Sequence, residues 1–90
     1  MAKPTQQAVA LRYESQNDTA PRVVAKGAGP IAEKIIQAAK DHDIPLVSDP
    51  VAGELLNHVD LGMEIPSEFY QAVAEILAFI YRLNEDYKTN

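Results

Sequence analysis

The first third of the chain contains two short apolar segments typical of β-strands, separated by a polar segment. In residues 8–13 three larger side chains fall on one face of an extended chain: Val9, Leu11 and Tyr13. Residues 14–21 are mostly polar and end in Ala-Pro, which predicts a loop. Residues 22–26 then have a continuous apolar centre, Val-Val-Ala, which predicts a second strand covered on both faces.

A helical period replaces the strand pattern after Gly27-Ala28-Gly29-Pro30, which we interpret as a tight strand-to-helix turn. Proline suits the first turn of a helix because its missing amide hydrogen would have no intrahelical partner there. Four apolar residues then recur at helical spacing: Ile31, Ile35, Ala38 and Ala39. We predict a helix over residues 30–41. Residues 44–47, Ile-Pro-Leu-Val, predict a short third strand reached by a right-handed parallel crossover.

Two further amphipathic patterns predict helices in the second half of the chain. Asp49 can cap a short helix that begins at Pro50 and stops before Gly62. Its apolar stripe consists of Val51, Leu55, Leu56 and Val59. The last pattern follows residues 66–68, Pro-Ser-Glu, and repeats apolar residues at three-and-four spacing: Phe69, Val73, Ile76, Leu77 and Ile80. It predicts a long amphipathic helix whose polar end frays from Glu85.

The order of these elements, β-β-α-β-α-α, predicts a small fold of the α/β (α+β) class. We expect a three-stranded mixed sheet packed with three helices. A chain of 90 residues is the size of one small domain, so we expect residues 1–90 to form a single domain. Residues 1–6 and 85–90 are expected to be flexible because they lie outside the periodic segments.

Composition restricts the compartment and the partners. The chain has no cysteine, which excludes disulfides and cysteine-ligated zinc and makes a cytoplasmic location the simplest prediction. No apolar run approaches the roughly 20 residues of a membrane-spanning helix, so we expect no direct membrane insertion. The net charge of −5 repels phosphate backbones and anionic headgroups, which makes nucleic acid an unfavourable partner.

Two histidines are the only candidates for acid-base or metal chemistry. His42 and His58 each have aspartates nearby, but neither belongs to a pair of ligands on one helix face. We therefore expect solvent-facing histidines at helix ends, no bound metal and no cofactor. A small hydrolase that uses His42 or His58 is an alternative function, but the sequence shows no nucleophile beside an activating base.

A series of short motifs in one order covers nearly the whole chain. They are Pro4-Thr5 with Ala8-Val9-Ala10-Leu11-Arg12-Tyr13, then Ala20-Pro21-Arg22-Val23-Val24-Ala25-Lys26-Gly27-Ala28-Gly29, Ile44-Pro45-Leu46-Val47, Glu64-Ile65-Pro66 and Tyr70-Gln71-Ala72-Val73-Ala74-Glu75-Ile76-Leu77-Ala78. Through these motifs residues 4–83 resemble the cytoplasmic domain of the FlhB export-switch family and its type III secretion counterparts. The resemblance implies a role in flagellar or type III protein export.

The resemblance places a degenerate cleavage loop at the start of the chain. Members of the FlhB family carry Asn-Pro-Thr-His there and cut themselves between Asn and Pro through attack by the Asn side chain. This chain has Lys3, Pro4, Thr5 and Gln6 instead. A lysine ammonium cannot form the cyclic imide that the cleavage requires. We therefore expect a non-enzymatic protein that does not cleave itself.

The resemblance also implies where partners bind. The family is thought to receive export substrates at a small apolar patch, whose residue types occur here as Ala20, Pro21, Ala74 and Leu77. For Ala20 and Pro21 a rigid loop end is an equally good interpretation. The expected partners are export-apparatus proteins or export substrates, met in the cytoplasm beside the membrane-embedded export gate, with an influence on substrate-specificity switching.

Family members also have a strand before the cleavage loop, and this chain starts without it. We therefore expect an open sheet edge that can pair with a partner strand or form a homodimer. A structural, oligomer-forming module that has lost export function remains an alternative.

Overall fold

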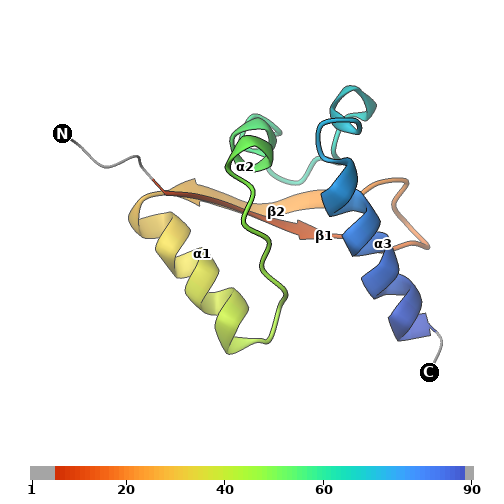
Figure 1. Cartoon of the computed structure of the whole chain (residues 1–90), viewed down its shortest axis with the longest axis horizontal. Coiled ribbons are helices and arrows are strands. Elements are labelled where there is room, and N and C mark those ends of the chain that lie inside the picture. Colours follow the sequence, from red (N-terminus) through yellow and green to blue (C-terminus); the bar gives the residue numbers. More distant parts are fainter. Residues whose placement is uncertain (1–5, 89–90) are drawn as a thin grey trace.

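Two strands and three α-helices make up the fold in residues 6–88, which are the residues that the computed structural model describes (Figure 1). The elements are β1 (Gln7–Arg12), β2 (Arg22–Ala28), α1 (Pro30–Asp41), α2 (Pro50–Leu56), a 3-10 turn η1 (Ser67–Phe69) and α3 (Ala74–Lys88). The predicted α+β class with three helices is therefore confirmed. None of these helices is both long and apolar enough to cross a bilayer.

The strands β1 and β2 form an antiparallel hairpin whose register shifts between Ala10 and Leu11. Ala10 pairs with Ala25 and Leu11 pairs with Val23, so Val24 is an extra residue on β2. Such a bulge turns the extra side chain away from the regular alternation. Val23 is fully buried whereas Val24 is 43% exposed. The prediction that the second strand is covered on both faces is therefore wrong at Val24.

The outer edge of β2 is closed by a returning loop. The amide of Val23 donates to the carbonyl of Met63 (3.0 Å), and the carbonyl of Val23 accepts from the amide of Gly62 (2.7 Å). Farther along the strand, Lys26 Nζ donates to the carbonyls of Asn57 and Val59 at 3.0 and 2.8 Å. The opposite edge, along β1, has no neighbouring strand in residues 6–88.

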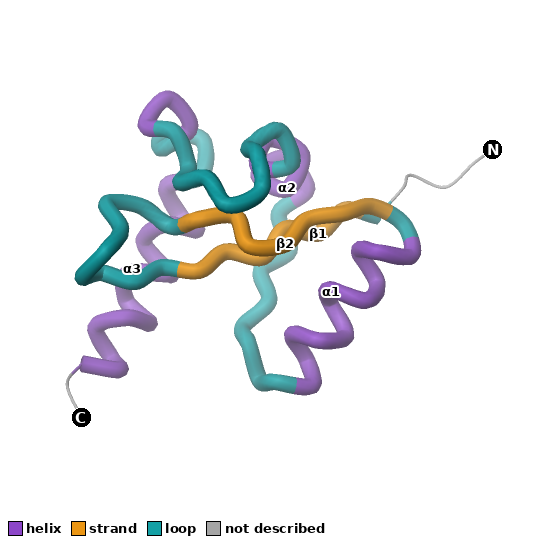
Figure 2. The backbone as a smooth tube through the Cα atoms, turned by 180° about the vertical axis from the view of Figure 1, so that it is seen from behind, coloured by secondary structure: helices purple, strands orange, loops and turns teal. Residues whose placement is uncertain are grey.

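The core lies between the hairpin, α2 and α3. Its buried residues are Val23, Ala52, Leu56, Val59, Ile65, Val73 and Leu77. Helix α1 lies on the other side of the hairpin from α2, as Figures 1 and 2 both show. It buries Ala39, as predicted, and Ala32, whereas Ile31, which was expected on the buried stripe, is 58% exposed.

Gly27 and Ile31 approach each other closely at the start of α1. A Cβ atom on Gly27 would lie 2.9 Å from the Cβ atom of Ile31 and still nearer to Cγ2 of that residue. The Ile31 side chain therefore packs against the glycine at the start of the helix. Only glycine leaves the room that this contact needs.

The predicted third strand, residues 44–47, does not form, and the sheet in the described part of the chain has two strands. Helix α1 ends in a Schellman motif: the amide of Ile44 donates to the carbonyl of Ala39 (2.8 Å), and Asp43 adopts a left-handed conformation (φ 55°). The chain then passes from α1 to α2 (Figure 1) without backbone hydrogen bonds at residues 45–48. Ile44, Leu46 and Val47 are each half-exposed.

The last helix keeps its predicted face but starts later. A 3-10 turn at Ser67–Phe69 precedes it, and the α-helix begins at Ala74 rather than directly after Pro66. Short 3-10 turns are common at the N-terminus of an α-helix. Val73 and Leu77 are buried, and Phe69 and Ile76 pack against the core, as predicted. The helix extends to Lys88.

Candidate functional site

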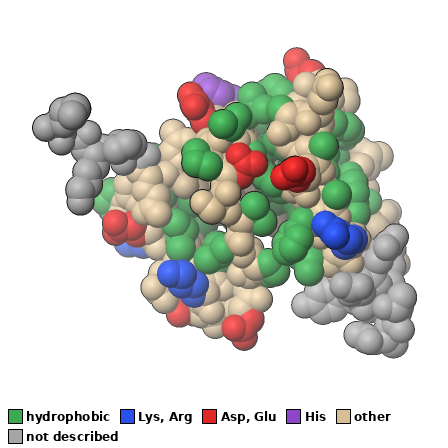
Figure 3. Space-filling view, viewed as in Figure 1, with side chains coloured by type: hydrophobic (Ala, Val, Ile, Leu, Met, Phe, Trp, Pro, Cys, Tyr) green, Lys and Arg blue, Asp and Glu red, His purple; other side chains and the backbone are tan. Residues whose placement is uncertain are grey.

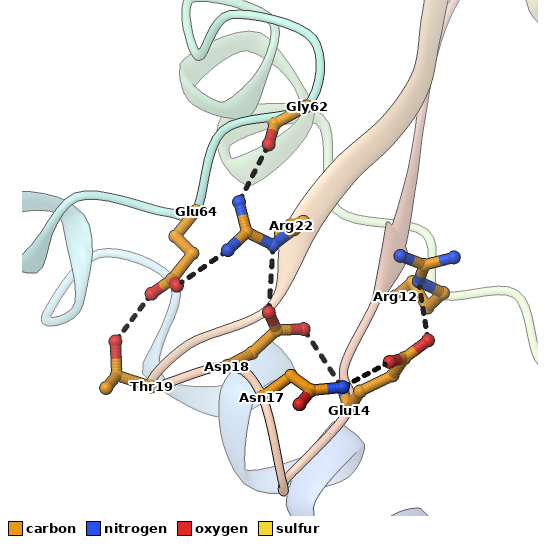
Figure 4. Close-up of polar contacts among 8 residues, drawn as sticks. All are labelled: Arg12, Glu14, Asn17, Asp18, Thr19, Arg22, Gly62 and Glu64. Carbon is orange, nitrogen blue, oxygen red and sulfur yellow. Dashed lines mark hydrogen bonds and ion pairs between the residues drawn. The ribbon is translucent and has the colours of Figure 1, made fainter.

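The hairpin loop between β1 and β2 is held by a buried carboxylate (Figure 4). The Asp18 side chain is 4% exposed and accepts a hydrogen bond from Arg22 Nε (2.8 Å) and one from the amide of Glu14 (3.1 Å). The hydrogen bond from Arg22, followed by that from the Glu14 amide, lowers the pKa of Asp18 below its ordinary value. The carboxylate thus fixes both ends of the loop.

Arg22 connects this network to the loop at residues 62–64, which runs along the edge of β2. Its Nη1 donates to the carbonyl of Gly62 (3.0 Å), and its Nη2 donates to Glu64 (3.2 Å). The hydroxyl of Thr19 donates to the other oxygen of the same carboxylate (2.5 Å). The guanidinium of Arg22 therefore ties the hairpin loop to the loop that closes the edge of β2, as Figure 4 shows.

This network encloses two of the predicted binding residues. Ala20 and Pro21 lie between Asp18 and Arg22, and both are fully buried. The hairpin loop lies beside α3 in both views of the backbone (Figures 1 and 2). The rings of Tyr13 and Tyr81 tie the two together, with centroids 5.0 Å apart and an interplanar angle of 69°. Burial, followed by the nearby Tyr13, raises the pKa of Tyr81.

The two predicted binding residues of α3 point in different directions. Ala74 is exposed, whereas Leu77 is 6% exposed and belongs to the core. Of the four residues assigned to the patch, Ala74 is therefore the one whose side chain has surface for a partner. Ala20 and Pro21 fit the interpretation as a rigid loop end. Leu77 anchors α3 to the hydrophobic core.

The degenerate cleavage loop is only partly within the described chain. Lys3, Pro4 and Thr5 lie outside the described residues. Gln6 is exposed, and its carbonyl accepts a hydrogen bond from the amide of Gly29 (2.7 Å). The start of β1 is thereby held next to the turn that leads into α1.

Both histidines are exposed and stand just after helices, as predicted. His42 caps the end of α1, where its Nδ1 lies 2.9 Å from the carbonyl of Ala38. His58 follows α2 at a distance of two residues. Within residues 6–88 no three His, Cys, Asp or Glu side chains come together in a way that could hold a metal ion.

A groove that the sequence did not reveal lies between residues 47–49 and the outer side of α3. It has a volume of about 470 Å³, and Ile76 and Phe79 contribute apolar side chains to its lining. Asp49, Glu75 and Arg82 add charge. Figure 3 shows hydrophobic side chains gathered on this face of the molecule. We call this surface the α3 groove.

The sequence contained one signal of the groove. Glu75, Phe79 and Arg82 recur at helical spacing beside the buried stripe, so they form a second, mixed face of α3. The opposite wall could not be predicted, because residues 44–47 were expected to form a strand.

Comparisons with known proteins agree with this arrangement. The model of the FlhB HrpN YscU SpaS family matches residues 1–80. The "Uncharacterized protein YlqH" of Bacillus subtilis is 45% identical over 85 residues, which are 94% of this chain and 91% of that protein. The flagellar biosynthetic protein FlhB of Aquifex aeolicus is 47% identical over 81 residues, which are 89% of this chain and 23% of FlhB. The chain thus spans less than a quarter of that FlhB.

A solved structure has the same fold. The crystal structure of the cytoplasmic domain of FlhB from Shewanella putrefaciens matches with a TM-score of 0.75 and 34% sequence identity. The match covers 92% of this chain and 65% of that one. Sequence and fold therefore lead to the same set of relatives.

Proposed function

Because the chain belongs to the FlhB/YscU family of flagellar and type III export proteins, we propose that it is a non-enzymatic accessory component of protein export. In this role it binds export-apparatus proteins or export substrates in the cytoplasm, beside the membrane-embedded gate, and influences substrate-specificity switching. The observation that carries the proposal is the family match over residues 1–80, together with the fold shared with the FlhB cytoplasmic domain.

Export in living cells tests this function directly. The chain is supplied to cells whose FlhB is truncated within its cytoplasmic domain, and exported flagellar proteins are measured in the culture medium. We expect export, or the timing of the specificity switch, to change when the chain is present. Unchanged export would favour the alternative of a structural module without an export role.

The absence of self-cleavage is a separate part of the proposal. It is supported by Lys3 and Gln6, which replace the Asn and His of the family loop. We expect the purified chain to keep its mass during prolonged incubation at neutral pH, as measured by mass spectrometry. Accumulation of a fragment that begins at Pro4 would contradict it.

Ala74 is the residue through which we propose that the predicted patch touches a partner. It is exposed, while Ala20, Pro21 and Leu77 are buried. A pulldown with export-apparatus proteins compares Ala74→Asp with Ala38→Asp, which changes another exposed alanine, on α1. Loss of capture with Ala74→Asp alone supports the patch, whereas equal capture by both variants contradicts it.

The open edge of β1 supports the proposal that two copies pair. In an antiparallel pairing centred between Val9 and Ala10, Gln7 of one copy faces Arg12 of the other, so no like charges oppose each other. Sedimentation equilibrium over a concentration series measures the association, and amide hydrogen exchange locates it. A protein that stays monomeric throughout, with β1 amides exchanging at a constant rate, would rule this dimer out.

A further inference from the structure

The segment between α1 and α2 combines exposed apolar side chains with unpaired backbone. Leu46 and Val47 are 50% and 53% exposed. The peptide groups of Leu46, Val47 and Ser48 make no hydrogen bond to any other part of the described chain. An extended segment with free amides and carbonyls is a template on which another strand can pair.

The α3 groove lies directly beside this segment, since Val47 and Ser48 form part of its lining. Ile76 and Phe79 are half-buried and offer an apolar floor. A peptide that pairs with the backbone at Val47 can therefore place one apolar side chain against α3. Backbone pairing supplies affinity in such complexes, and the side-chain pocket supplies selectivity.

The charges of the groove are separated along its length. Glu75 and Arg82 are seven residues apart on α3, so they stand about 10 Å apart along the helix axis. Asp49 adds a second acidic group. One of its carboxylate oxygens accepts a hydrogen bond from the amide of Ala52. The side chains of Asp49, Glu75 and Arg82 form no other hydrogen bond or ion pair with residues 6–83.

We propose that the α3 groove binds an extended peptide from a partner protein. The peptide has an apolar residue with a basic residue on one side, facing Asp49 and Glu75, and an acidic residue on the other, facing Arg82. An extended chain rises about 3.3 Å per residue, so the two charged residues stand about three or four positions apart. The assignment of this peptide to an exported protein rests on the proposed function; the peptide chemistry does not.

Charge decides between a foreign peptide and a second copy. Each copy carries a net charge of −5, so two copies repel each other at this acidic end of the groove. A basic side chain from another protein meets two carboxylates there instead. The open edge of β1, which carries no acidic residue, is the better place for self-association.

Binding is measured by fluorescence anisotropy with a short labelled peptide of the pattern Lys-Thr-Val-Thr-Glu, extended by threonine and serine. Amide chemical shifts of the full chain are recorded by NMR in parallel. We expect the amides of Leu46, Val47 and Ser48 to shift, together with those of α3 around Phe79. A peptide with proline in place of the central valine, which cannot complete the backbone pairing, is the negative control.

Two matched variants locate the site. Val47→Glu places a charge in the groove and should weaken binding about tenfold or more, because it replaces an apolar contact with a charge that binding would bury. Leu61→Glu, which adds the same charge at a residue 62% exposed and outside the groove, should leave binding unchanged. Glu75→Lys should weaken binding about two- to fivefold, and this variant should prefer a peptide in which glutamate replaces the lysine while the second glutamate still faces Arg82.

Three results would overturn the proposal: equal weakening by Val47→Glu and Leu61→Glu, shifts confined to other parts of the chain, or no binding by any of these peptides. Concentration-dependent dimerisation that Val47→Glu abolishes would also overturn it, because the groove would then be an interface between copies. The export assay is independent of these outcomes. Peptide binding can fail while the chain still alters export, and binding can succeed in a chain that has no effect on export.

Discussion

Leu77 provides the sharpest test of how the predicted patch is built. Its side chain is 6% exposed and lies in the core, so Leu77→Ala leaves a cavity instead of changing the surface. The substitution removes three carbon atoms, which is worth about 2.4 kcal/mol at about 0.8 kcal/mol for each. Incomplete collapse of the cavity adds to this, so we expect the free energy of unfolding to fall by about 3 kcal/mol.

Such a loss is large for a domain of 90 residues. At about 0.05–0.15 kcal/mol per residue, the whole domain is stable by about 5–13 kcal/mol. A loss of about 3 kcal/mol should lower Tm by about 12–24 °C, at about 4–8 °C per kcal/mol. Urea unfolding followed by circular dichroism measures the free energy, and a thermal scan under the same buffer conditions measures Tm.

Two control variants separate the core from the surface. Leu61→Ala makes the same change at a leucine that is 62% exposed and should alter the free energy of unfolding by no more than about 0.5 kcal/mol. Ala74→Asp changes an exposed residue in the first turn of α3, where a negative charge is favourable, and should be equally mild. The reasoning fails if Leu77→Ala costs no more than Leu61→Ala.

The same comparison separates two explanations of lost binding. If Leu77→Ala weakens partner binding only in proportion to the fraction of the variant that is unfolded, then the role of Leu77 is to support α3. If Leu77→Ala weakens partner binding at temperatures where the variant is fully folded, the Leu77 side chain must become accessible in the complex. Ala74→Asp, assayed at temperatures where circular dichroism shows it to be folded, reports direct contact.

Three further predictions concern the frame of the fold. Gly27→Ala should destabilise the chain by about 1–3 kcal/mol in urea unfolding, because its Cβ atom collides with Ile31. Asp49→Ala should cost about 1 kcal/mol and reduce helicity, because the carboxylate caps the start of α2; full retention of stability would show that the cap is dispensable. The lowered pKa of Asp18 means that its contribution to stability is complete above the ordinary pKa of about 3.9 and is lost as the pH falls through the lower folded value. Asp18→Asn should therefore be less stable than the wild type at neutral pH and lose less further stability on acidification, and parallel pH curves for the two proteins would contradict the ion pair with Arg22.

Local periodicity was enough to predict most of the elements. The hairpin strands and the helix at Pro30–Asp41 follow from patterns that a few neighbouring residues determine. Residues 44–47 have the composition of a strand, but a strand also needs a partner with free backbone groups. In the described chain the Schellman motif directs this segment toward α2, and no ladder forms. The prediction was therefore right about the residues' character and wrong about their pairing.

The candidate site depended on contacts that are distant in the sequence. Ala20 and Pro21 read as a surface loop because their neighbours are polar. They are buried because Arg22 reaches Gly62 and Glu64, about forty residues away, and draws the loop against the rest of the fold. Nothing in the local pattern indicates which arginine will make such a contact. The α3 groove was missed for the same reason, since its two walls come from separate parts of the chain.

The loop that returns along β2 has a consequence for assembly. It occupies the hydrogen-bonding groups of Val23 and, through Lys26, lies along the same edge farther down the strand. Another strand can then join the sheet only beside β1. Because the β2 edge is covered, a second copy that pairs with β1 completes the sheet. Two copies that meet along β1 use up the free edge of each other's sheet, so pairing through the sheets gives a closed dimer.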